Sequence, residues 1–215
     1  MVDAVVPLTA GATLVLRLPE GAAREPDEAL PALAVPSLPG ARIAARRGWQ
    51  SSGLTLRAAC MAAPAGGWAP GVEEIVLARA TQLAREALAG KASPFTVGEQ
   101  TAAGSGFEQR FEGSLRQGGD TLSVRGRHWL GFAGDAPDAV VCTAVCTEPQ
   151  AASGCEALIV AASRGGTWAE VPPPNVLART LLLAAEHPHQ ALGVLVTGSL
   201  VVAALIIARR PRPRA

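Results

Sequence analysis

The sequence predicts an α+β domain followed by one C-terminal transmembrane helix. The domain is expected to be an antiparallel β-sheet of about seven to eight strands flanked by two helices. Alternating apolar and polar residues recur along most of the chain, and one long amphipathic helix interrupts them. An uncharged apolar stretch near the C-terminus is the third observation. Together these patterns favour helices packed on an antiparallel sheet and a separate membrane segment.

The composition excludes two classes of protein. Of the 215 residues, 49% are hydrophobic and 17% are charged. A disordered chain needs the opposite balance, because it cannot bury enough apolar surface to fold. The formal net charge is only +1. We therefore expect no binding to nucleic acid, which needs a basic surface.

The first part of the chain reads as strands and one irregular segment. We expect strands at residues 12–18, 41–49 and 54–61. Residues 19–39 contain five prolines, which are too many for a helix or a central strand. This proline-rich loop is predicted to be a long ordered loop or a lid.

Residues 72–89 are the clearest helix of the domain. Apolar residues recur at helical spacing, and charged residues occupy the opposite side. Glu73 and Glu74 make the first turn acidic, and Gly90 follows as a stop. We expect this helix to cover one face of the sheet.

After the helix the sequence shows strand signals until about residue 162. The expected strands are 95–102, 107–116, 121–132, 139–148 and 155–162. A turn follows at 164–167, and a second helix is predicted over 176–186. With these elements the domain spans residues 1–186.

One hairpin can be registered from the sequence. Gly118 and Gly119 suit a two-residue type I′ turn, which fixes the pairing of the flanking strands. The predicted pairs on the apolar face are Leu115 with Leu122, Phe111 with Gly126, and Phe107 with Leu130. On the other face Glu112 meets Arg125, Arg110 faces Arg127, and Glu108 is a diagonal neighbour.

The C-terminal stretch has the length of a membrane span. Residues 191–208 contain no charge, and 18 helical residues extend about 27 Å, close to the hydrocarbon thickness of a bilayer. A linker at 187–190 precedes the span, and a basic tail at 209–215 follows it. The flanking residues suited to the lipid headgroups are His187, His189, Arg209, Arg210, Arg212 and Arg214. A buried core helix is the alternative, but four arginines directly after it are hard to place.

The sequence allows two orientations of the predicted membrane span. The positive-inside rule places the arginine tail in the cytoplasm and the domain outside. Residues 1–18 lack the basic start of a signal peptide, however, so we expect a C-terminal anchor with the domain on the cytoplasmic side. Lys91 is the only lysine, which together with the many alanines indicates a GC-rich bacterial genome and hence a bacterial inner membrane.

The cysteines allow two interpretations. Cys142 and Cys146 lie on one face of a predicted strand, and we prefer the interpretation that the cysteines are small buried thiols. The alternative is a disulfide between Cys146 and Cys155 as partners on neighbouring strands, which would place the domain in an oxidising compartment. A metal site is not predicted, because the spacing C-x3-C-x8-C is unusual for zinc.

The charged face of the hairpin is the candidate interaction face. Its residues are Glu108, Arg110, Glu112, Arg125 and Arg127. Charge-paired strands facing solvent or a partner protein are the favoured interpretation, and an anionic ligand is the alternative. His128 is expected to be packed or hydrogen-bonded. No phosphate-binding loop, nucleophile elbow or zinc-protease motif occurs, so we predict no cofactor and favour a non-enzymatic role.

In the order of its elements, the range 12–186 resembles the sandwich fold of the PsbP-like superfamily. The resemblance rests on the strand-rich centre, the helix at 72–89 and the late helix. It implies a binding or assembly factor without catalysis, as for most members of that superfamily. No site residue is carried over from it.

We therefore expect a non-catalytic binding, accessory or assembly subunit of a membrane-associated complex. Its partners would be the bilayer, through residues 191–208, and another protein. The alternative is a ligand-binding or enzymatic domain with a pocket under the proline-rich loop, in which His128 or Arg127 converge. A purely structural tether is a third hypothesis.

Overall fold

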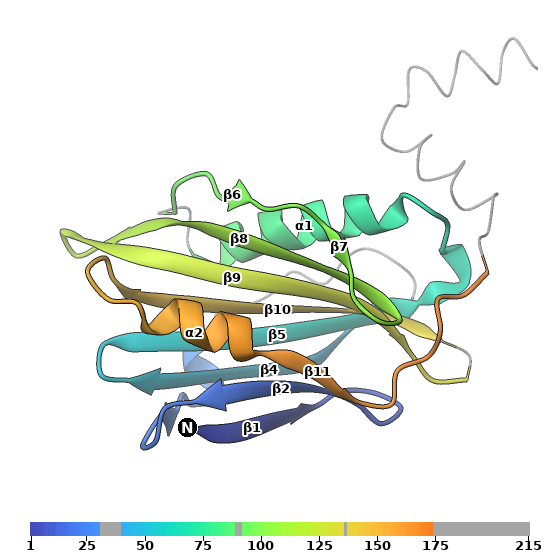
Figure 1. Ribbon diagram of the computed structural model, residues 1–215, viewed down its shortest axis with the longest axis horizontal. Helices are drawn as coiled ribbons and strands as arrows, with labels where there is room; N and C mark the ends of the chain where they lie inside the picture. Colours follow the sequence, from blue (N-terminus) through green and yellow to red (C-terminus); the bar gives the residue numbers. More distant parts are fainter. Residues whose placement is uncertain (31–39, 89–91, 136, 174–215) are drawn as a thin grey trace, which may run out of the picture.

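The computed structural model describes residues 1–30, 40–88, 92–135 and 137–173 and confirms an α+β fold (Figure 1). The described residues form two antiparallel sheets and two α-helices. The larger sheet has eight strands in the order β3-β4-β5-β10-β9-β8-β6, with β7 paired to β8 beside β6. The smaller sheet has the order β1-β2-β11.

The strands of the larger sheet are β3 (Ala23–Arg24), β4 (Arg42–Ser51), β5 (Leu54–Pro64), β6 (Thr96–Val97), β7 (Thr101–Ala102), β8 (Gly106–Gln117), β9 (Asp120–Ala133) and β10 (Asp138–Pro149). The smaller sheet contains β1 (Val2–Pro7), β2 (Ala12–Leu18) and β11 (Ser163–Gly166). The helices are α1 (Val72–Ala87), α2 (Gly154–Ala161) and the short 3-10 turns η1 (Asp27–Ala29) and η2 (Ala65–Gly67).

The larger sheet is the central layer of the domain. The smaller sheet and α2 cover one face of it, and their shared core contains Leu16, Trp129 and Ile159. Helix α1 covers the other face, where Leu77 packs with Leu130. Alternate residues of β9 therefore enter two different cores, as the strand period requires.

The β8–β9 hairpin has the predicted register. Both turn glycines have positive φ, +60° at Gly118 and +98° at Gly119, as a type I′ turn requires. Phe111 lies opposite Gly126, and its ring covers that glycine so closely that an added Cβ would overlap it. The alternation of Phe, Leu and charged residues was sufficient to fix this pairing.

The predicted strand at 155–162 is wrong, because this segment forms the helix α2. Cys155, Leu158, Ile159 and Ala162 are buried, and their spacing is that of one helix face. The buried carboxylate of Glu148 accepts the Cys155 N–H at 3.0 Å and holds the start of the helix. A short apolar run does not distinguish a strand from a buried helix by its periodicity alone.

Three further elements differ from the prediction. Strand β1 was not predicted from the sequence, and the predicted turn at 164–167 overlaps β11. Both belong to the smaller sheet, which is additional to the single sheet expected. The predicted strand at 95–102 is reduced to the two short strands β6 and β7.

The C-terminal predictions lie outside the described residues. These are the helix at 176–186, the span at 191–208 and the flanking His187, His189, Arg209, Arg210, Arg212 and Arg214. Among the described residues, neither helix is long and apolar enough to cross a bilayer.

Candidate ligand-binding groove

A groove lies between α1 and the sheet face formed by β4, β5 and β10. Its volume is about 220 Å³. On the helix side the lining residues are apolar: Ala80, Leu83, Ala84, Ala87 and Leu88. On the sheet side small residues leave the space open: Ala59, Thr143 and Val145. The N-terminal half of α1 packs over β8, β9 and β10 through Val72, Val76 and Leu77, and its C-terminal half lies above small side chains.

A buried ion pair lies at the β4–β5 edge of the groove. The Arg57 guanidinium donates to both carboxylate oxygens of Glu25, at 2.8 and 2.9 Å, and Gln50 donates to one of them at 2.6 Å. Glu25 is 4% exposed. The hydrogen bonds from Arg57 lower the pKa of Glu25 against the opposing effect of burial. This bidentate pair holds the Arg57 side chain in place.

Gly48 makes room for this ion pair. A Cβ at position 48 would overlap the Glu25 carboxylate and would lie 2.6 Å from a methyl carbon of Leu30. The carboxylate therefore lies directly on the strand. Glycine is required at position 48 because the Glu25 carboxylate approaches the backbone closely. The sequence around Gly48 does not indicate this approach.

We expect Arg57→Ala to lower the free energy of unfolding by about 2–3 kcal/mol, because it leaves the Glu25 charge buried without its partner. The Arg57 side chain is 35% exposed, so the cost stays below that of a fully buried pair. Urea unfolding at pH 7 measures the change. Arg24→Ala is the matched control, since the Arg24–Asp27 pair is exposed and should contribute less than about 1 kcal/mol. Equal effects of the two substitutions would contradict this assignment.

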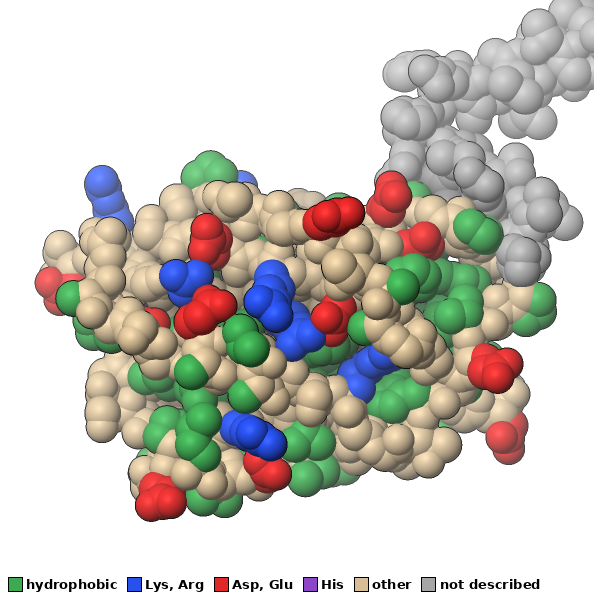
Figure 2. All heavy atoms as spheres, viewed as in Figure 1, with side chains coloured by type: hydrophobic (Ala, Val, Ile, Leu, Met, Phe, Trp, Pro, Cys, Tyr) green, Lys and Arg blue, Asp and Glu red, His purple; other side chains and the backbone are tan. Residues whose placement is uncertain are grey.

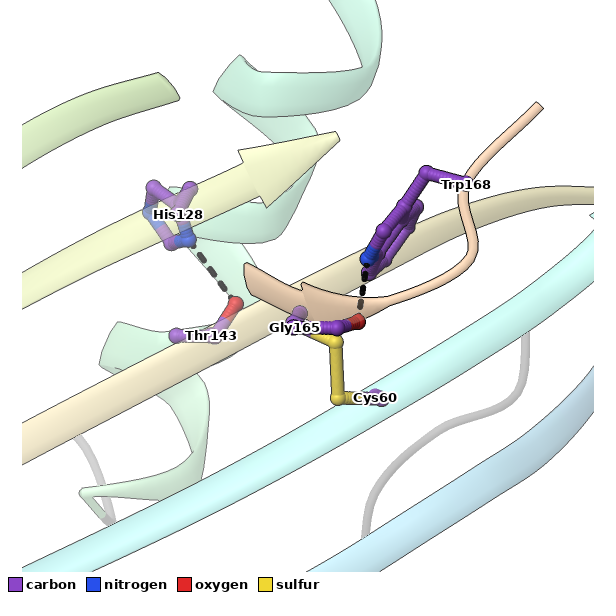
Figure 3. The surroundings of a disulfide bond; sticks show 6 residues. Cys60, His128, Thr143, Gly165 and Trp168 are labelled. Atoms are coloured by element: carbon purple, nitrogen blue, oxygen red, sulfur yellow. Dashed lines mark hydrogen bonds between the residues drawn. A yellow bond between two sulfur atoms is a disulfide. The ribbon is translucent and has the colours of Figure 1, made fainter. Parts of the chain in front are cut away.

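His128 is packed beneath α1, as the sequence predicts. Its ring is fully buried, with Nε2 3.0 Å from Thr81 Oγ1 and Nδ1 2.8 Å from Thr143 Oγ1 (Figure 3). Thr81 donates its own hydrogen to the Leu77 carbonyl, so it accepts from His128 Nε2, and Thr143 donates to Nδ1. Burial lowers the pKa of His128 to about 3. The ring is therefore neutral at pH 7 and joins α1 to the sheet.

Arg127 lies on the opposite face of the sheet. Its guanidinium donates to Glu108 and to the carbonyls of Val160 and Ala162 at the end of α2. The alternative hypothesis had His128 or Arg127 converge in a pocket under the proline-rich loop. Neither residue lines this groove, and the two side chains lie on opposite faces of the sheet. From the proline-rich loop, Leu30 is the described residue that lines the groove.

The five residues of the candidate interaction face lie together on β8 and β9. Arg125 pairs with Glu112 at 2.8 Å and also with Glu156 of α2 at 3.0 Å. Figure 2 shows basic and acidic side chains alternating over β8, β9 and α2. Within the described ranges, Arg110 is exposed and makes no ion pair. A partner at this face stays a prediction.

All four cysteines are joined in disulfides. Cys146 pairs with Cys155, and Cys60 pairs with Cys142, whose surroundings Figure 3 shows. The interpretation as buried thiols is therefore wrong in its chemistry, although all four residues are fully buried. Cys155 comes from a helix and not from the expected strand. Within the described part of the chain, no cluster of His, Cys, Asp and Glu residues suited to a metal occurs.

Comparison with known proteins identifies no family. No family model matches the chain, and no curated protein matches it. The solved structure of LpqN, involved in cell envelope biogenesis of Mycobacterium tuberculosis, is 12% identical, with a TM-score of 0.43 over 75% of this chain and 90% of LpqN. A Pseudomonas aeruginosa protein of unknown function, PA94, a putative regulator, is also 12% identical, with a TM-score of 0.28 over 69% of this chain and 84% of PA94. Likeness at this distance carries no inference about function.

Proposed function

We propose that the domain is a non-catalytic binding domain that takes a small, largely apolar ligand in the groove beneath α1. The observation that carries this proposal is the groove itself, which combines apolar walls with a fixed cation at one edge. The polar groups around it support binding over catalysis. Both nitrogens of His128 and both carboxylate oxygens of Glu25 are already bonded within the fold.

We further propose that residues 191–208 hold this domain at a bacterial membrane, on its oxidising side. Two disulfides support this side, because such bonds persist in oxidising compartments and are rare in the cytosol. The arginine tail supports the same orientation through the positive-inside rule. This differs from the cytoplasmic side expected above, and it matches the other orientation that the sequence allows.

A photoreactive probe tests the binding function in the full chain. The protein is placed in phosphatidylcholine nanodiscs with decanol that carries a terminal diazirine, illuminated, and its crosslinked peptides are mapped. We expect labelling within α1 and β5. Filling the groove with Ala59→Leu and Ala87→Leu should reduce this labelling at least fivefold. Ala78→Leu, on the exposed side of α1, is the matched control. Labelling that is unchanged by the filled groove would refute the proposal.

An exposed cysteine tests the orientation. Ala78→Cys places a reactive thiol on the outer side of α1, while the four native cysteines are held in disulfides. We expect a membrane-impermeant maleimide to modify this variant in intact spheroplasts, and the wild-type chain to stay unmodified. Modification of Ala78→Cys only after lysis would place the domain in the cytoplasm.

A further inference from the structure

We propose that Arg164 of β11 forms a second binding site, in which its guanidinium takes a carboxylate or phosphate group through two parallel hydrogen bonds. The site lies on the face of the larger sheet opposite the groove, and it does not depend on the proposed binding function. Its basis is the way in which the fold holds this side chain and leaves one edge of it without a partner.

Three glycines make room for the Arg164 guanidinium. Gly106 of β8 and Gly131 of β9 face each other across the two strands. A Cβ at position 106 would lie 2.5 Å from Arg164 Nη1, and a Cβ at position 131 would lie 2.9 Å from the same atom. A Cβ at Gly104, in the turn before β8, would lie 3.4 Å from Nη2. The guanidinium therefore lies directly on the backbone of the larger sheet.

Trp168 holds the guanidinium from another side. The Cζ atom of Arg164 lies 5.3 Å from the centre of the Trp168 ring, which is a cation–π distance. The indole Nε1 donates to the Gly165 carbonyl at 2.8 Å and keeps the ring beside β11 (Figure 3). Arg164 is thus positioned by glycine backbone and an aromatic ring, and neither of them carries a negative charge.

One edge of the Arg164 guanidinium is free to bind a ligand. Its Nη1 is enclosed and has no hydrogen bond. Within the described ranges, Nε and Nη2 make no hydrogen bond or ion pair either, and the side chain is partly exposed. These two N–H groups form the edge that binds a carboxylate or phosphate bidentately. Arg57 uses the same edge, Nε and Nη2, to bind Glu25.

The described part of the fold does not balance the charge of Arg164. Glu108 is the acidic residue whose charge acts on the pKa of Arg164, and its carboxylate is already paired with Arg127. Two arginines therefore share one carboxylate at this place. Partial burial lowers the pKa of Arg164, because it disfavours the charged form. An anion at the free edge would stabilise that form, which makes a carboxylate or phosphate the complementary group.

Protection from an arginine-specific reagent tests the site in the full chain. Phenylglyoxal modifies accessible guanidinium groups, and mass spectrometry quantifies the modified peptides. The protein is held in micelles of an uncharged detergent with sodium phosphate, acetate or chloride at equal ionic strength. We expect phosphate or acetate to slow the modification of Arg164 at least fivefold relative to chloride, because two oxygens of one anion match the two N–H groups. Arg17, exposed on β2, is the internal control and should react equally in all three salts.

The stronger of the two protecting anions identifies the preferred group. Equal modification of Arg164 in all three salts would overturn the proposal. An Arg164 that does not react with phenylglyoxal would overturn it as well, since an edge closed to the reagent is closed to the anion.

Variants of Arg164 separate binding from a purely structural role. A ligand that binds the folded state raises the urea midpoint of unfolding, and we expect phosphate to raise it relative to chloride. This shift should be at least threefold smaller in Arg164→Gln, and smaller also in Arg164→Lys, which keeps the charge but lacks the paired N–H groups. Arg17→Gln is the matched control and should keep the full shift, including the general stabilisation by phosphate. A shift that is unchanged in Arg164→Gln would overturn the proposal.

Discussion

Replacing Cys60 and Cys142 together by alanine is expected to lower the free energy of unfolding by about 4.5 kcal/mol. The double replacement of Cys146 and Cys155 should cost only about 2.6 kcal/mol. The first disulfide closes a chain segment with a sequence separation of 82 residues, and the second closes one of 9. A crosslink over a longer segment removes more conformational entropy from the unfolded chain, as the loop-closure relation gives.

Urea unfolding of the full chain, followed by tryptophan fluorescence, measures both values. All four tryptophans precede residue 174, so the signal reports on the domain. Replacing each pair together avoids a single leftover thiol in the core. Adding a reductant to the wild-type protein during unfolding should reproduce the combined loss. If removing the Cys146–Cys155 disulfide cost as much as removing the Cys60–Cys142 disulfide, or more, the disulfides would stabilise the protein through the folded state and not by restricting the unfolded chain.

The second large effect is a fall in stability between pH 7 and pH 5. His128 titrates near 6.5 when it is exposed, and burial lowers its pKa in the folded protein to about 3. Between these two pH values, His128 is protonated in the unfolded chain and neutral in the folded chain. The contribution of neutral, buried His128 to the free energy of unfolding is therefore fully present above about pH 6.5 and is lost as the pH falls toward 3. From pH 7 to pH 5 we expect a loss of about 2 kcal/mol.

The variant His128→Gln separates this residue from other acid effects. An amide can bond both Thr81 and Thr143 and does not titrate. Its unfolding free energy should stay nearly level over the same interval, although its value at pH 7 will be lower. Glu25 interferes little, because the stabilisation from its lowered pKa is lost only as the pH falls through its ordinary value of 4.5 and below. Parallel slopes for the variant and the wild type would contradict the assignment to His128.

Local pairing was predictable from the sequence, and distant pairing was not. The β8–β9 hairpin was fixed by Gly118, Gly119 and the alternation beside them, since all the information lies within one short segment. The partner of Cys142 is Cys60, and this pair forms only when β5 and β10 lie side by side. No local sequence pattern indicates that β5 and β10, which are far apart in the chain, are neighbours in the sheet.

The groove was not predictable for the same reason. It exists because alanines and threonines of β5 and β10 lie under one half of α1, and no single segment shows this. The Glu25–Arg57 pair likewise joins the proline-rich loop to β5 across 32 residues. A possible signal was the long loop itself, since such loops in compact domains are often functional. The alternative hypothesis of a ligand-binding or enzymatic domain named His128 or Arg127 for that pocket, although successive residues of a strand face opposite sides.

Strand β10 carries one cysteine of each disulfide, Cys142 and Cys146. It is therefore bonded covalently to β5 on one side and to α2 behind it. A protease that cuts the turn between β9 and β10 would separate the backbone into two pieces that remain one particle, because Cys60 and Cys142 lie on opposite sides of the cut. The damage would be visible only on a reducing gel. A domain built in this way keeps its two halves together after cleavage between β9 and β10.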